Sequence, residues 1–156
     1  MAVKEAAARV LSLQIDGLVP LPVAVAAPTA YRAFTGQEVA ADEFHLLARL
    51  AGGRPPMLHK AFAGTAGACT AVAASIHGTI PHAVLPSQRE TDLVVIGHPS
   101  GLMQTRARVS GPPWVVERAG YSRTARRLME GYAYVRTALL ARGAAPSAEV
   151  SVAGRR

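Results

Sequence analysis

Residues 64–76 read Gly-Thr-Ala-Gly-Ala-Cys-Thr-Ala-Val-Ala-Ala-Ser-Ile, and none of these side chains is charged. Every residue in the segment is small or apolar, and a helix that lacks a polar face is covered on all sides. In a chain of 156 residues, the size of one compact domain, this pattern predicts a central helix enclosed by strands. Gly78, Thr79 and Pro81 are expected to end the helix.

Strand patterns on both sides of this segment supply the expected sheet. Residues 23–27 form a short apolar run bounded by prolines, and residues 92–97 form a second run. Residues 103–109 alternate apolar side chains with Gln and Arg, so one face of that strand is expected to be wet. Shorter strands are expected at residues 10–15 and 115–118.

Two further helices are expected. Residues 3–9 combine Ala, Lys, Glu and Arg, which are good helix formers. After a turn at residues 35–36, residues 42–50 place their apolar side chains at helical spacing behind an acidic first turn. Residues 122–136 are ambiguous by pattern, because a helix-favouring start is followed by Gly131 and then by strand-favouring residues.

The composition belongs to a folding chain, with 50% hydrophobic and 17% charged residues. The net charge of +7 is compatible with nucleic acid, an anionic membrane or small anionic substrates. The basic residues are scattered without interleaved aromatic residues, so no nucleic-acid partner is expected. Apolar runs are too short for a membrane span and no signal peptide is evident, which favours a cytoplasmic protein without membrane attachment. Residues 141–156, rich in Ala, Gly and Ser, are expected to form a mobile tail.

Cysteine and histidine usage predicts no metal site. Cys69 is the one cysteine, so neither an intramolecular disulfide nor a structural zinc site is expected. Its place inside the uncharged helix is typical of an inert, buried thiol. His45 is expected on a helix surface, and His77 and His82 flank a turn, without metal-ligand spacing to another ligand.

The segment that leads into the central helix offers a site for an anion. Residues 59–65 read His-Lys-Ala-Phe-Ala-Gly-Thr, and small residues there let a ligand approach the backbone. The first amides of a helix have no partner within it, and the helix dipole adds positive potential. We therefore consider Gly64, Thr65 and Ala66 as carboxylate-binding residues. The alternative, which the pattern alone favours, is that Thr65 only caps the helix and Gly64 only permits tight packing.

A second candidate is the sequence His98-Pro99-Ser100-Gly101, which joins two expected strands. Its hydroxyl, imidazole and backbone amides could bind an anion or move a proton. An ordinary hairpin turn is the alternative, because Pro, Ser and Gly are common turn residues. No acidic residue lies close in sequence to complete a triad, and Ser100 is not in a nucleophile elbow.

Three segments, in order, resemble the PrpF family. Residues 59–69, His-Lys-Ala-Phe-Ala-Gly-Thr-Ala-Gly-Ala-Cys, continued by residues 74–79, resemble the helix motif of that family and the turn behind it. His98-Pro99-Ser100-Gly101 resembles the second family signature, and residues 121–131, Tyr-Ser-Arg-Thr-Ala-Arg-Arg-Leu-Met-Glu-Gly, resemble the closing segment. The resemblance runs from about Pro22 to Val135, and three ordered motifs are more specific than any one of them.

This resemblance implies an α/β (α+β) fold like that of diaminopimelate epimerase. In that fold two similar domains each wrap a curved mixed sheet around a central helix, here residues 64–77, and the active site lies between the domains. The chain is expected to form one such domain over residues 1–140, corresponding to the C-terminal half of a family member. The resemblance also favours a strand within residues 122–136.

The resemblance further implies an enzyme. Family members include isomerases of 2-methylaconitate, methylitaconate and 4-oxalomesaconate, which transfer a proton next to a carboxylate without a cofactor. Residues 64–66 would then hold one carboxylate of an unsaturated di- or tricarboxylate, and Ser100 and Gly101 would contact another part of it. His59 and His98 are the candidates for proton movement.

Two departures from the relatives bear on catalysis. The acid–base lysine and cysteine of the family belong to an N-terminal domain for which this chain has no counterpart. Ala63 stands where diaminopimelate epimerase has its second catalytic cysteine. We therefore expect an anion-binding half that an N-terminal domain or a partner chain completes. The alternative is an inactive fragment that binds carboxylates or other proteins, with an exposed apolar face that would favour homo-oligomers.

Overall fold

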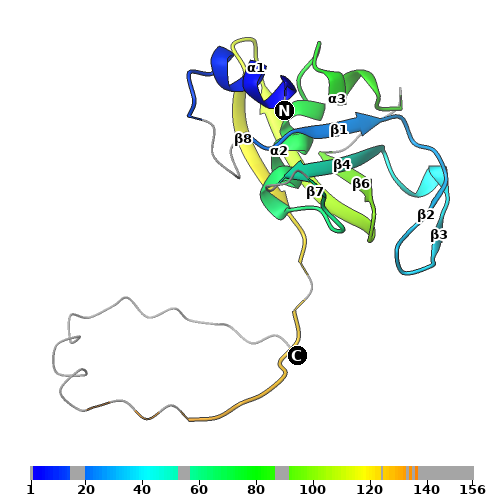
Figure 1. The fold of residues 1–156 in the computed structure, drawn as a ribbon, viewed down its shortest axis with the longest axis vertical. Coiled ribbons are helices and arrows are strands. Elements are labelled where there is room, and N and C mark those ends of the chain that lie inside the picture. Colours follow the sequence, from blue (N-terminus) through cyan, green and yellow to red (C-terminus); the bar gives the residue numbers. More distant parts are fainter. Residues whose placement is uncertain are drawn as a thin grey trace. The chain divides into compact units, whose positions relative to one another are not determined.

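The computed structural model describes residues 2–14, 20–52, 57–86, 92–123, 125–132, 134 and 136. The chain divides into two compact units, Met1–Arg123 and Thr124–Arg156, and the helices and strands of the described residues all lie in the first (Figure 1). In chain order the elements are α1 (Ala2–Val10), β1 (Val23–Ala26), β2 (Tyr31–Arg32), β3 (Glu38–Val39), the 3-10 turn η1 (Ala41–Glu43), β4 (Leu46–Gly52), β5 (Met57–Leu58), α2 (Gly64–Ala74), α3 (Ile80–Ala83), β6 (Leu93–His98), β7 (Gly101–Ser110) and β8 (Val115–Tyr121).

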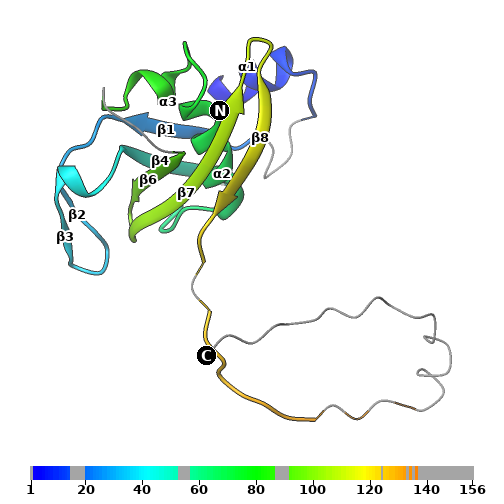
Figure 2. The ribbon, with the colours of Figure 1, turned by 180° about the vertical axis from the view of Figure 1, so that it is seen from behind.

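A mixed sheet bends around α2. Its strand order is β1-β4-β6-β7-β8, with β5 paired to β4. Strands β4 and β6 run parallel, and the other pairings of this sheet are antiparallel. Figures 1 and 2 show α2 between β1 and β4 on one side and β7 and β8 on the other. The expected sheet around a central helix is therefore confirmed.

Small residues allow α2 to approach the sheet closely. Gly64, Gly67, Ala71 and Ala74 recur at helical spacing and form a buried stripe along the helix. A Cβ on Gly67 would lie 2.7 Å from Sδ of Met103 on β7, so only glycine fits there without a shift. Because the helix has no charged residue, every strand that faces it can be apolar.

The strands cover α2 less completely than expected. Thr65 and Cys69 are exposed, so the prediction of a helix buried on every side, with a buried thiol, is wrong along this one stripe. The strands wrap the glycine and alanine stripe and leave the opposite stripe open. The helix also ends at Ala74, before the expected boundary at residue 77.

The main core lies between α2 and the inner face of the sheet. Leu46, Ala48 and Leu50 of β4 alternate inward and are at most 2% exposed. The helix predicted over residues 42–50 is therefore wrong beyond the short turn η1. Apolar residues at 44, 47, 48 and 50 fit a helical period, but pairing with β1 on one side and β6 on the other imposes the period of two.

Other expectations divide between confirmed and wrong. The helix over 3–9, the turn at 35–36 and the strands near 23–27, 92–97, 103–109 and 115–118 are confirmed. The strand over 10–15 is wrong for residues 10–14, because Val10 ends α1 and residues 11–14 are exposed outside any strand; residue 15 lies outside the described residues. The strand favoured within 122–136 is wrong for the described residues there, which form no ladder. The limit at residue 140 and the tail over 141–156 lie outside the described residues and stay predictions.

No helix among the described residues has the length and apolar character needed to cross a membrane.

Candidate functional site

The two candidate segments, far apart in sequence, meet at one end of the fold. The hydroxyl of Ser100, in the turn between β6 and β7, donates a hydrogen bond to the carbonyl oxygen of Lys60, which lies just before α2. These residues are 40 positions apart. The contact joins the hairpin to the start of α2, so the candidate carboxylate-binding residues of both segments belong to one surface region.

The first turn of α2 presents free backbone amides. Ala63 is the N-cap, with φ −65° and ψ 135°, and no side chain caps the helix. The amide of Gly67 donates to the Ala63 carbonyl at 2.9 Å, and within the described residues the amides of Gly64, Thr65 and Ala66 have no acceptor. Such amides, together with the helix dipole, attract an anion.

The alternative interpretation of this helix start is partly right. Thr65 is not the N-cap, since that position belongs to Ala63. Gly64 does serve close packing, because a Cβ there would lie 2.3 Å from two ring carbons of Tyr121 on β8. Tyr121 therefore lies against the start of α2, a neighbour that the sequence pattern does not identify.

The turn between β6 and β7 is a tight hairpin. His98 pairs with Gly101 at the end of the ladder, and Gly101 has a φ of +124°, a conformation that glycine adopts readily. The hydroxyl of Tyr31 donates to the carbonyl oxygens of Gly101 at 2.6 Å and of His98 at 3.0 Å. The hairpin alternative is thus correct as geometry, and these contacts hold Ser100 and Gly101 in place.

His98 is a buried and neutral imidazole. Its side chain stacks on the ring of Phe62 with centroids 6.3 Å apart, and its Nδ1 accepts from the Ser100 amide at 3.2 Å. Burial lowers the pKa of His98 below its ordinary value, and the positive charge of Arg49 acts in the same direction against an opposing contribution from the Leu102 backbone. The residue is therefore unprotonated near pH 7.

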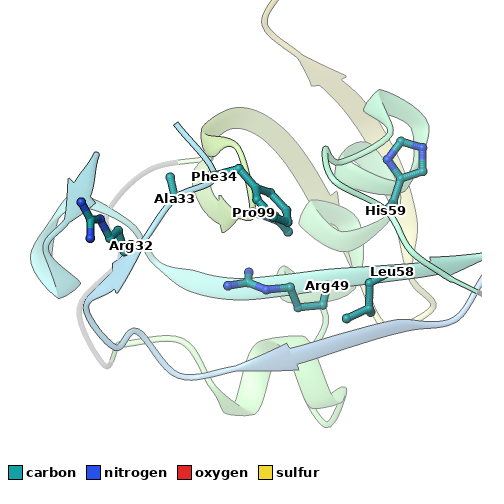
Figure 3. A pocket seen from close by; sticks show the side chains of 7 residues that line it. All are labelled: Arg32, Ala33, Phe34, Arg49, Leu58, His59 and Pro99. Atoms are coloured by element: carbon teal, nitrogen blue, oxygen red, sulfur yellow. The ribbon is translucent and has the colours of Figure 1, made fainter. Parts of the chain in front are cut away.

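His59 has a different environment. It is exposed, and its Nδ1 accepts from the Ala61 amide at 3.2 Å. It lines a cavity of about 280 Å³ together with Arg32, Phe34, Arg49 and Pro99 (Figure 3). Proton transfer by His59 would involve its other ring nitrogen.

A second hollow, of about 400 Å³, lies along the open face of α2. Thr65, Ala66 and Cys69 of α2 line it together with Val23 and Val25 of β1. Its walls are mainly apolar and carry no charged side chain. The hollow therefore places apolar surface directly beside two of the free amides.

The sequence of the chain matches the family described as PrpF protein over residues 3–136. The chain belongs to the PrpF family. It is 43% identical over 122 residues to the 3-methylitaconate isomerase of Eubacterium barkeri, which covers 78% of this chain and 31% of that protein. It is 39% identical over 114 residues to the 2-methyl-aconitate isomerase of Shewanella oneidensis, covering 71% of this chain and 28% of that protein.

Among solved structures, methylitaconate-delta-isomerase shares this fold. It aligns with a TM-score of 0.66 and 38% identity over 94% of this chain and 36% of its own. The PrpF-type fold implied by the sequence motifs is therefore confirmed. The chain spans about a third of the length of these PrpF relatives.

Within the described part of this PrpF-family chain, no three His, Cys, Asp or Glu side chains lie close enough together to hold a metal ion.

Sequence reasoning misses Arg49, the half-buried cation of the smaller cavity. The helix predicted over residues 42–50 would place this side chain toward solvent. The alternation of Leu46, Ala48 and Leu50 with Leu47 and Arg49 is the signal that places it on the outer face of a strand.

We expect His98 to make the stability of the fold depend on pH. Between its lowered pKa and the ordinary value of about 6.5, the unfolded chain binds a proton that the folded chain does not. The free energy of unfolding therefore falls as pH drops below about 6.5, with a slope of at most ~1.4 kcal/mol per pH unit from this group. Urea unfolding at pH 8 and pH 5 measures the difference.

The matched variant is His98→Asn, which does not titrate and keeps an acceptor for the Ser100 amide. Its loss of stability between pH 8 and pH 5 should be smaller than that of the wild type. An equal loss in both proteins would show that other groups cause the pH dependence.

Proposed function

We propose that the chain is part of a cytoplasmic, cofactor-independent isomerase of unsaturated di- and tricarboxylates, and that it supplies the carboxylate-binding groups. The three amides of residues 64–66, which have no acceptor among the described residues, support this proposal most directly. The isomerase names of the relatives, which concern methylitaconate and 2-methylaconitate, support the substrate class.

The proposed chemistry needs fixed positive potential. Removing a proton next to a carboxylate builds negative charge on that carboxylate as a dienolate forms. Backbone amides that already point at the carboxylate oxygens stabilise this charge without reorganisation. In this proposal the first turn of α2 holds the carboxylate that gains charge, and Ser100 and Gly101 lie beside it on the same surface through the Ser100–Lys60 contact.

The base is the component that this chain provides least well. His98 is only 8% exposed and its Nδ1 is occupied by the Ser100 amide. His59 is exposed, and it would need to approach the substrate with its remaining nitrogen. We therefore propose that another domain or chain supplies the acid–base groups across the open face of α2.

A non-catalytic carboxylate-binding or interaction module is the second candidate. The shielded His98 and the exposed apolar hollow along α2 favour it. In that case the anion site would still bind its ligand, but no proton would move. If the fold had become only an interaction module, carboxylate binding would also be absent.

Calorimetry with the tricarboxylate cis-aconitate tests the binding part of the proposal. Thr65→Val removes a hydroxyl beside the free amides and keeps the side-chain shape, so we expect at least a tenfold loss of affinity, because a hydrogen bond to a charged group contributes about 1.5–3 kcal/mol. Thr29→Val makes the same change at an exposed loop position and should bind as the wild type does. If Thr65→Val and Thr29→Val bound cis-aconitate with equal affinity, this result would contradict the assignment of the site to the start of α2.

A further inference from the structure

Arg49 is a half-buried cation without a carboxylate partner. One of its terminal nitrogens donates to the carbonyl oxygens of Ala48 at 2.9 Å and Gly97 at 3.3 Å. Its guanidinium carbon lies 5.3 Å from the centroid of the Tyr31 ring. Among the described residues, no carboxylate lies within 4 Å of it. The strand and the ring thus fix the guanidinium while its charge stays unneutralised.

The cavity of about 280 Å³ beside Arg49 has a basic and apolar lining (Figure 3). Arg32 reaches it from the β2–β3 hairpin, but its charge is shared with Glu38 at 3.5 Å and its side chain is 72% exposed. Phe34 and Leu58 contribute apolar surface at the rim, and the Phe34 amide is anchored to the carbonyl of Pro99 at 2.7 Å. No acidic side chain lines the cavity.

We propose that this cavity is a binding site for a small organic acid, whose carboxylate pairs with Arg49 and whose flat, apolar part contacts Phe34 and Leu58. Arg49 is partly removed from water and has no counter-charge, and a carboxylate that forms paired hydrogen bonds with the guanidinium would offset the cost of that desolvation. The remaining nitrogens of Arg49 have no acceptor among the described residues. The site is distinct from the amides of α2 and does not depend on the proposed isomerase activity.

A purely structural role is the competing explanation. The bonds from Arg49 to Ala48 and Gly97 tie β4 to β6, and the Tyr31 contact covers the outer face of the sheet. Such a role would account for the position of the arginine but not for a cavity beside it that lacks any counter-charge. The two explanations differ in whether a carboxylate binds there.

Amide NMR titration of the full chain with benzoate tests the proposal, and neutral benzamide, which has the same shape, is the control ligand. We expect benzoate to shift the amides of Phe34, Leu58 and His59 and to saturate, and benzamide to leave them unchanged. Arg49→Gln should weaken benzoate binding at least tenfold. Arg108→Gln also removes one arginine charge, but near the end of β7 that is farther from the Pro99 turn and the cavity. This variant should bind benzoate as the wild type does.

Phe34→Ala provides a second variant if Arg49→Gln does not fold, because the Phe34 side chain is 69% exposed and the core does not need it. It should weaken benzoate binding several-fold. The proposal is overturned if benzamide binds as well as benzoate, if the shifts are confined to residues 64–66, or if neither variant at positions 34 and 49 loses affinity.

Discussion

Replacing Ile96 by alanine is expected to lower the free energy of unfolding by about 3 kcal/mol. Ile96 is fully buried in the main core, on β6, between Leu46 of β4 and Met103 of β7. The substitution removes apolar contacts and leaves a cavity that the neighbouring strands cannot fill, because both are held by ladder hydrogen bonds. Urea unfolding monitored by circular dichroism measures the change.

Ile80→Ala is the matched control, since it makes the same change at a side chain that is 73% exposed at the start of α3. Its effect should stay within about 0.5 kcal/mol. If the two variants were equally stable, the sheet would not surround a packed core in the way the strand order requires.

Replacing Ala63 by aspartate is expected to stabilise the fold and to weaken anion binding. Ala63 has N-cap geometry without a capping side chain, and an aspartate there can accept hydrogen bonds from the free amides of the first turn. We expect the free energy of unfolding to rise by about 1 kcal/mol. The affinity for cis-aconitate should fall at least tenfold, because the new carboxylate occupies those amides and repels the ligand.

Ala63→Ser separates capping from charge. It should give a similar gain in stability, with a smaller loss of affinity, since it occupies one amide without repelling the ligand. Unfolding curves and calorimetry on the same samples give both quantities. An aspartate variant that binds cis-aconitate as the wild type does would remove the α2 amides from the binding site.

A capping residue at position 63 is expected to raise stability and to lower affinity, and these opposite effects explain an unusual feature of α2. A helix that lies at the centre of the fold starts without a side-chain cap, although Ser, Thr, Asp or Asn at position 63 would stabilise it. Ala63 is partly buried and packs against the main core, so packing also favours a small residue at this position. An uncapped start leaves the amides available to a ligand, so stability is lower where binding is proposed.

The central helix could be predicted from sequence because its residue pattern is unambiguous. Residues 64–74 contain no charge, and two glycines three residues apart allow close approach to β7 and β8. Strand β7 is equally clear, because its alternation of apolar and polar residues extends over most of ten positions. Both patterns are local, and each fits only one type of element.

The segment over residues 44–50 shows where local patterns fail. It fits the period of a helix and the period of a strand, and the choice depends on β1 and β6, which are distant in sequence. A helix predicted over these residues would place Arg49 toward solvent, and the cavity beside it would not be found. The contact between Ser100 and Lys60 is equally beyond reach, because nothing in either segment specifies the other.

Our central proposal is that this chain binds the carboxylate and that another domain or chain supplies the base. The chain carries free amides at the start of α2 and a fixed hairpin beside them, while His98 is shielded from solvent. A complete isomerase would remove the proton next to a carboxylate of methylitaconate and would therefore exchange that proton with solvent. A binding half alone would hold the ligand without exchange.

Proton NMR of methylitaconate in D₂O with the full chain tests this claim most directly. We expect the ligand to bind, as seen by broadened ligand signals that cis-aconitate reverses, while the signal of the proton next to the carboxylate stays constant. Loss of that signal, or formation of the isomer, at the rate of a full-length methylitaconate isomerase would contradict the claim, because the chain would then contain its own base.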